Sequence, residues 1–279
     1  MKVERPGPAG DAAGDLEYGS GGVTAMGWPA VLAVGMSATI VAAFLFVPPV
    51  RGLGATTTIL FFHVPPAWVA VSAWLLSLLH SVLYLRRGDL RSDRKAGVHA
   101  ELGLVFCAIT VVTGAIWARG TWGVYWNWDP RQTSALMLLL IYFAYVGLRG
   151  TIADPIRRAR SSAAYAIFAF AGVPFLMFVV PRAFPSLHPS PIIGGGAGGG
   201  LGPAARIVFA ASLAAFTGLY AWMYGIRLRL EALAGRPAHR DTALSGGLDG
   251  LVPDVGAGSE PAPTGDLAVA ATLAVTRFS

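Results

Sequence analysis

The chain has 279 residues, of which 54% are hydrophobic and only 13% are charged, and its mean hydropathy is +0.58. This composition is far too apolar for a soluble domain. The formal net charge of +6 raises the question of a nucleic-acid partner, but the basic residues lie between apolar stretches, so they indicate membrane topology and no nucleic acid is expected. The sequence therefore predicts an integral membrane protein.

Six uncharged stretches are long enough, with modest extension, to cross a hydrocarbon core of about 30 Å. A seventh, residues 183–205, contains four prolines and the run GGGAGGG, so its backbone could not be satisfied in lipid and we expect a loop. The predicted fold class is all-α, a polytopic membrane protein with six transmembrane helices. These helices are expected at about 27–47, 65–86, 97–117, 131–149, 161–181 and 205–226.

The second of these helices follows a double proline. The segment TTTILFFHVPPAWVAVSAWLLSLLHSVLYL would measure about 45 Å as a continuous helix, which is too long for one straight crossing. Pro65 and Pro66 suit the first helical positions, where a missing N–H costs nothing. We therefore expect the helix to begin at Pro65, with His63 at the outer boundary of the membrane.

Basic residues gather in alternate connections and so predict the orientation of the chain. Most of them follow the second, fourth and sixth helices, and the positive-inside rule then predicts that both termini are cytoplasmic. Residues 1–26 are polar, with no removable signal peptide evident, and residues 230–279 are rich in Gly, Ala, Pro and acids. Both are expected to be disordered extensions of a six-helix domain at 27–229.

Several chemistries are excluded by the motifs that the sequence lacks. Cys107 is the single cysteine, so no intramolecular disulfide or CxxC redox pair can form, and there is no CxxCH motif for covalent c-type heme. The GxSxG, HExxH and P-loop motifs are also absent. Glu101 lies near the cytoplasmic end of the third helix, two residues from His99, where we expect an interfacial ion pair rather than a proton relay.

The segment TWGVYWNWDP, residues 121–130, concentrates aromatic side chains between two apolar stretches. An interfacial belt of Trp and Tyr is one interpretation. A belt usually spreads its anchors over several helix ends, whereas here Tyr125 and three tryptophans, Trp122, Trp126 and Trp128, crowd together. A broad aromatic shelf of this kind would match a large planar apolar ligand by stacking.

Two of the five histidines are candidate metal ligands. His63 precedes the double proline, His188 lies in the loop FPSLHPSPII, and the predicted topology puts both on the outer side. Two neutral imidazoles on opposite faces of an iron porphyrin give bis-histidine ligation. The alternative is that each hydrogen-bonds a backbone carbonyl at a helix end. Structural or interfacial roles are expected for His80 and His99, and none for His239.

Asp129 and Pro130 stand where the fourth helix is expected to begin. An Asp N-cap followed by Pro at the first helical position explains the pair and fixes the angle of the aromatic segment. Arg119 and Arg131 flank this segment and could pair with carboxylates such as heme propionates, or reach lipid phosphates. Arg131 is the stronger candidate because the rigid Asp-Pro step ties it to the segment.

The octapeptide WGVYWNWD, residues 122–129, resembles the tryptophan-rich WWD signature of the heme-handling membrane proteins of cytochrome c maturation. The segments FFHVPPAW (61–68), DPRQTSALMLLLIYFAYVGL (129–148) and SLHPS (186–190) are most similar to the CcmC family, also called heme exporter protein C. The resemblance extends over about residues 28–226. The two histidine motifs stand in the expected order, which makes it more specific.

This resemblance implies a protein that holds non-covalent b-type heme at the outer face of the membrane, with His63 and His188 as axial ligands to the iron. The implied partners are a CcmE-like heme chaperone, a CcmA/CcmB-type ABC transporter, a small CcmD-like membrane protein and the bilayer itself. It implies a delivery and assembly factor, with no catalytic residues, rather than an enzyme. The other residues placed at the implied heme site are Arg119, Trp122, Tyr125, Trp126, Trp128, Asp129 and Arg131.

Two alternative functions remain open at this point. A small polytopic transporter or quinone-binding membrane subunit would use the tryptophans as belt residues and the histidines structurally. A CcsA-type heme lyase component would attach heme directly to an apocytochrome. The sister families CcsA and CcmF share the tryptophan signature but have more helices and extra histidines, so six helices and two outer histidines favour CcmC.

Overall fold

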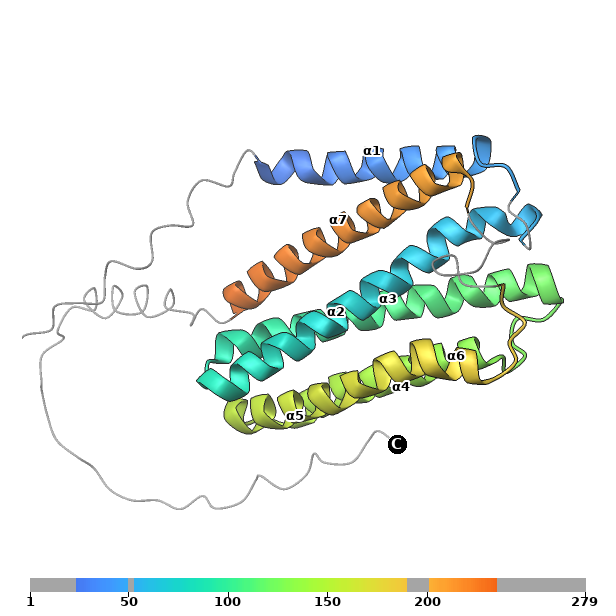
Figure 1. Ribbon diagram of the computed structural model, residues 1–279. Helices are drawn as coiled ribbons and strands as arrows, with labels where there is room; N and C mark the ends of the chain where they lie inside the picture. Colours follow the sequence, from blue (N-terminus) through green and yellow to red (C-terminus); the bar gives the residue numbers. More distant parts are fainter. Residues whose placement is uncertain (1–23, 50–52, 190–200, 235–279) are drawn as a thin grey trace, which may run out of the picture. The chain divides into compact units, whose positions relative to one another are not determined.

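The computed structural model describes residues 24–49, 53–189 and 201–234, and within these ranges the chain forms helices and loops but no β-strand (Figure 1). The predicted all-α class is therefore confirmed. The helices are α1 (Thr24–Leu45), the 3-10 helix η1 (Ala55–Ile59), α2 (Leu60–Arg87), α3 (Leu90–Trp122), α4 (Pro130–Thr151), α5 (Pro155–Pro174), the π-helix η2 (Phe175–Val179), α6 (Val180–Ala183) and α7 (Pro203–Ala234).

Six helical segments of the described chain are long and apolar enough to cross a membrane, which confirms the predicted six-helix, multi-pass membrane protein. The chain divides into two units, Met1–Leu233 and Ala234–Ser279, and all of the second except Ala234 lies outside the described residues. Most of the two predicted extensions, 1–26 and 230–279, also lies outside them. The six segments are Gly27–Leu45, Thr56–Arg87, Leu90–Trp122, Pro130–Thr151, Pro155–Ala183 and Pro203–Glu231.

The helices α3, α4 and α5 each begin after an aspartate that accepts a hydrogen bond from a backbone N–H of the first turn. Such a cap satisfies a donor that the helix itself cannot pair. The predicted N-cap role of Asp129 is thereby confirmed, and Pro130 follows it at the first helical position. The bonds run from Arg91 N to Asp89 Oδ1 (2.8 Å), from Arg131 N to Asp129 Oδ1 (2.9 Å) and from Arg157 N to Asp154 Oδ1 (2.6 Å).

The prediction that the second helix begins at Pro65 is wrong, because α2 begins five residues earlier, at Leu60. A proline inside a helix leaves the carbonyl four residues before it without an N–H donor. For Pro65 that carbonyl belongs to Phe61, and it accepts a hydrogen bond from Ser212 Oγ on α7 instead. The helix therefore continues through the double proline and holds His63 in regular helical structure.

The helix α3 extends beyond the predicted 97–117 at both ends, and its 33 residues measure about 50 Å. Trp122 consequently belongs to its last turn. Gly123 ends the helix in the left-handed conformation, with φ of 79°, and donates its N–H to Arg119 O at 3.2 Å. This conformation favours glycine, which explains the Gly inside the aromatic segment.

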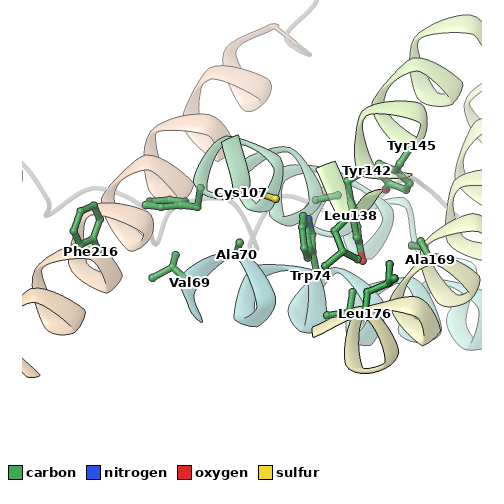
Figure 2. Close-up of a cluster of buried hydrophobic side chains, with 14 residues drawn as sticks. Val69, Ala70, Trp74, Cys107, Leu138, Tyr142, Tyr145, Ala169, Leu176 and Phe216 are labelled. Atoms are coloured by element: carbon green, nitrogen blue, oxygen red, sulfur yellow. The ribbon is translucent and has the colours of Figure 1, made fainter. Parts of the chain in front are cut away.

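The hydrophobic core is centred on Trp74 of α2 (Figure 2). Its indole stacks on Tyr142 of α4, with ring centroids 4.0 Å apart and an interplanar angle of 5°. On the α3 side, a Cβ atom at Gly103 would lie 2.4 Å from Trp74 Nε1, so only glycine allows the two helices to approach this closely. These contacts fix the positions of α2, α3 and α4 relative to one another.

A partly buried ion pair joins α3 to α4 near the start of α3. Arg149 donates through Nη1 to Asp93 Oδ1 at 2.6 Å and through Nη2 to Asp93 Oδ2 at 3.0 Å, which is the bidentate geometry that makes such pairs strong. Glu101 forms the expected ion pair, and its partner is Arg227 of α7. His99 contacts the Tyr220 hydroxyl, also on α7.

The fifth crossing is interrupted by a turn of π-helix. The segments α5, η2 and α6 follow one another directly from Pro155 to Ala183, with Pro174 just before the π turn and Pro181 just after it. Prolines remove the donors of regular helical hydrogen bonds, and π turns often mark functional positions. Here the irregular segment forms part of a cavity wall.

Candidate functional site

A cavity of about 1010 Å³ lies between α2, α3, α4 and the η2–α6 segment. Most of its lining side chains are apolar, and they include Trp68, Leu138 and Phe178. His63 and His188, which are far apart in the sequence, both line it. Two further residues of the predicted set also line it, namely Trp126 and Arg131.

His63 is half-buried on α2, and its Nδ1 lies 3.1 Å from Thr113 Oγ1 on α3. The Thr113 hydroxyl donates its own hydrogen to Ile109 O at 2.8 Å, so it accepts a hydrogen bond from His63 Nδ1–H. This tautomer puts the lone pair on Nε2. A Cβ atom at Gly114 would lie only 2.8 Å from His63 Cε1, so the glycine makes room for the ring.

His188 is held by the carboxylate of Asp129, with its Nδ1 2.8 Å from Asp129 Oδ1. The other carboxylate oxygen, Oδ2, accepts hydrogen bonds from Leu187 N at 2.7 Å and from Ser186 Oγ at 3.0 Å. An ionised carboxylate can only accept, so His188 Nδ1 bears the hydrogen and Nε2 bears the lone pair. Asp129 therefore caps α4 and also fixes the loop that contains His188.

The protonation states of this pair follow from burial and hydrogen bonding. Burial lowers the pKa of His188 below its ordinary value, and the positive charge of Arg131 acts in the same direction against the opposing effect of Asp129. Burial alone would raise the pKa of Asp129, but hydrogen bonds from the N–H groups of Arg131 and Leu187 hold it below its ordinary range. At neutral pH the pair is a neutral imidazole and a carboxylate.

The two histidines approach α3 about one helical turn apart. His63 contacts Gly114, and His188 contacts Trp117, with ring centroids 5.3 Å apart in the latter pair. Three residues of α-helix rise about 4.5 Å. The structure thus brings two histidines with matching tautomers to one cavity.

Trp117 is a site residue that the sequence analysis did not single out. It is buried, lines the cavity and donates from Nε1 to Thr56 Oγ1 at 3.0 Å. Its ring meets that of Trp122 edge-on at 4.8 Å, and Trp122 in turn lies edge-on to His188 at 5.0 Å. The position of Trp117, five residues before Trp122 and at the end of the third uncharged stretch, was the available sequence signal.

The aromatic segment between α3 and α4 is fixed from inside by Gln132. Its Oε1 accepts from Asn127 N at 3.2 Å, and its Nε2 donates to Tyr125 O at 3.4 Å. Trp128 adopts a left-handed backbone conformation, with φ of 61°, which is uncommon for a bulky residue. The rings of Trp126 and Trp128 are perpendicular, with centroids 5.9 Å apart, so they do not form the expected flat shelf.

Five residues of the predicted set do not line the cavity, and two of these, Trp122 and Asp129, contact His188 instead. Trp128 is 70% exposed and Tyr125 is 61% exposed, while Arg119 donates to Gly123 O and lies over the Tyr125 ring. Trp126 is the member of the segment that lines the cavity, and Trp122 reaches the site through its contact with His188. The aromatic segment therefore covers the site with some of its rings and exposes others.

These features define a multi-pass α-helical membrane protein with an aromatic-lined cavity that contains two histidines. The family model for CcmC, heme exporter protein C, matches residues 20–243. The chain belongs to this family.

Individual relatives are similar over shorter segments. The heme exporter protein C of Bradyrhizobium diazoefficiens is 32% identical over 183 residues, which are 66% of this chain and 69% of the relative. That of Rhodobacter capsulatus is 38% identical over 112 residues, 40% and 46% of the two chains, and that of Paracoccus denitrificans is 42% identical over 102 residues, 37% and 42%. The chain thus spans less than half the length of these last two relatives.

Proposed function

We propose that this chain binds b-type heme non-covalently, with His63 and His188 as axial ligands to the iron, and delivers it for cytochrome c maturation. One observation is the main support: the two histidines line the same apolar cavity, and each has its Nδ1 hydrogen-bonded to a protein oxygen. A hydrogen bond at one ring nitrogen orients an imidazole so that the other nitrogen can bind a metal.

The residues present fit heme better than a bare metal ion. In the part of the chain that the structure describes, no group of three or more His, Cys, Asp or Glu gathers as a metal site. Heme brings four nitrogen ligands of its own and needs only the two axial positions from the protein. A flat, largely apolar macrocycle also suits a cavity lined by Trp68, Trp117 and Trp126.

The same proposal assigns an orientation and partners to the protein. The basic connections after α2 and α4 would be cytoplasmic, which puts His63, His188 and the aromatic segment at the outer face of the cytoplasmic membrane. A CcmE-like chaperone would receive the heme there, with a CcmA/CcmB-type transporter and a small CcmD-like protein as further partners. We expect both axial ligands to be neutral imidazoles, and this kind of ligation would suit a protein that must pass its heme on.

The test is to purify the full chain from heme-replete membranes and mix it with the soluble domain of a CcmE-like chaperone. We expect a sharp b-type Soret band on the purified chain, followed by its loss as the chaperone domain acquires heme. A chain that purifies colourless and does not bind added heme would contradict the proposal. A heme-loaded chain that attaches its heme directly to an apocytochrome would support the lyase alternative instead.

Substitution at Gly114 tests whether His63 must occupy its observed position. In a Gly114→Ala variant the new methyl group would meet the His63 ring at 2.8 Å and displace it, so we expect heme affinity to fall about 10-fold. Gly120→Ala is the matched control on the same helix, because its Cβ would meet Thr56 Cγ2 at an ordinary 3.7 Å. Heme titration followed by absorbance measures both, and equal affinities in the two variants would refute the role assigned to His63.

A further inference from the structure

Two arginines are the charged side chains on the described lining of the cavity, and no aspartate or glutamate of that lining balances them. Arg131 stands in the first turn of α4, and Arg182 in the last turn of α6. Both side chains line the same, mostly apolar cavity. Like charges gathered at an apolar cavity are unfavourable unless an anion neutralises them.

Most of the hydrogen-bonding capacity of these two arginines remains for a ligand. Arg131 Nη1 donates to Pro189 O at 3.2 Å, and Arg182 Nη1 donates to Phe178 O at 2.8 Å. A guanidinium group has five N–H donors in a fork that matches a carboxylate. Among the described acids, none is within ion-pair distance of either arginine. Asp129, which is near Arg131, is already bonded to His188 and its loop.

We propose that Arg182 acts with Arg131 to bind the two carboxylate groups of an anionic porphyrin, and that this pair positions the heme in the cavity. The inference rests on the proposed function and adds a residue that the sequence motifs did not indicate. Arg182 replaces Arg119 as the second cation, because Arg182 lines the cavity whereas Arg119 folds back onto the aromatic segment.

The position of Arg182 depends on the irregular helix before it. The π turn η2 and Pro181 place Phe178 and Arg182 on the cavity wall together, and the Arg182 guanidinium lies 6.0 Å from the centre of the Phe178 ring. Two guanidinium groups would neutralise two propionates, whereas the same wall would repel a metal cation. The site is therefore predicted to select tetrapyrroles that have free carboxylates.

The experiment compares heme with its dimethyl ester, in which both propionates are neutral, on the purified full chain. For Arg182→Gln we expect heme affinity to fall about 10-fold and ester affinity to stay at the wild-type level. Arg182→Lys, which retains the charge, should bind heme more tightly than Arg182→Gln. Arg206→Gln is the control, because Arg206 is exposed in the first turn of α7 and is absent from the cavity lining.

The outcomes separate the two proposals. If Arg182→Gln binds heme as tightly as the wild type, or weakens heme and ester equally, the role of Arg182 is refuted while heme binding itself stands. If the wild-type chain binds neither compound, the proposed function fails and this inference fails with it. Unchanged ester binding in Arg182→Gln also shows that the variant is folded.

Discussion

The His63→Ala, His188→Ala double variant is expected to purify without heme, whereas the wild-type chain retains it. Both imidazoles line the same cavity, and each presents Nε2 because Nδ1 is bound to Thr113 or Asp129. Loss of both removes every proposed bond from protein to iron, and the remaining stacking adds only about 0.5 to 1.5 kcal/mol per aromatic pair beyond apolar burial. The measurement is the heme-to-protein ratio from the Soret absorbance.

The single variants and a control make this result specific. Each single change should leave one axial ligand, with a weaker and shifted Soret band. His80→Ala is the control, because His80 lies farther along α2 and hydrogen-bonds Leu76 O of its own helix at 2.9 Å. A double variant that retains wild-type heme, or a His80→Ala variant that loses it equally, would contradict the assignment of the ligands.

Replacing Asp129 by alanine is expected to weaken heme binding by about 10- to 100-fold, the usual effect of removing a group that orients a metal ligand. The change frees the His188 ring and removes the acceptor for Leu187 N and Ser186 Oγ, which hold the loop in place. It also removes the N-cap of α4, at a cost of about 1 kcal/mol in stability. Heme titration and thermal unfolding measure the two effects separately.

Asp154→Ala is the matched control for Asp129. Asp154 caps α5 through Arg157 N and is followed by Pro155, so it shares the Asp-Pro step of α4. Among the described residues no histidine is hydrogen-bonded to it. We expect it to lose a similar stability and no heme affinity. Equal heme affinities in the Asp129→Ala and Asp154→Ala variants would show that Asp129 is only a helix cap.

The parts of this structure that depend on local sequence could be predicted from it. The lengths of the uncharged stretches identified all six candidate membrane-spanning segments. The Asp129-Pro130 step correctly marked the start of α4, because capping depends on neighbouring residues alone. The loop with His188 was recognised by its prolines. Its attachment to Asp129 was not predicted, since that contact joins residues 59 positions apart.

Tertiary contacts decided the features that sequence reasoning missed. Pro65 was expected to start a helix because its missing N–H would otherwise leave a carbonyl unpaired, but Ser212 of α7 supplies the donor. Arg119 was expected at the site for its nearness in sequence to the tryptophans, whereas the left-handed Gly123 turns the chain so that Arg119 folds back. Arg182 reaches the cavity through a π turn that no sequence pattern indicated.

The electron paramagnetic resonance spectrum of the purified chain with one equivalent of ferric heme tests the central claim most directly. Two imidazole ligands should give a low-spin ferric signal in the wild type, and His188→Ala should convert it to high spin, with added imidazole restoring the low-spin form. A high-spin signal from the wild-type chain, or a low-spin signal that persists in the His63→Ala, His188→Ala variant, would show that these histidines do not bind the iron together.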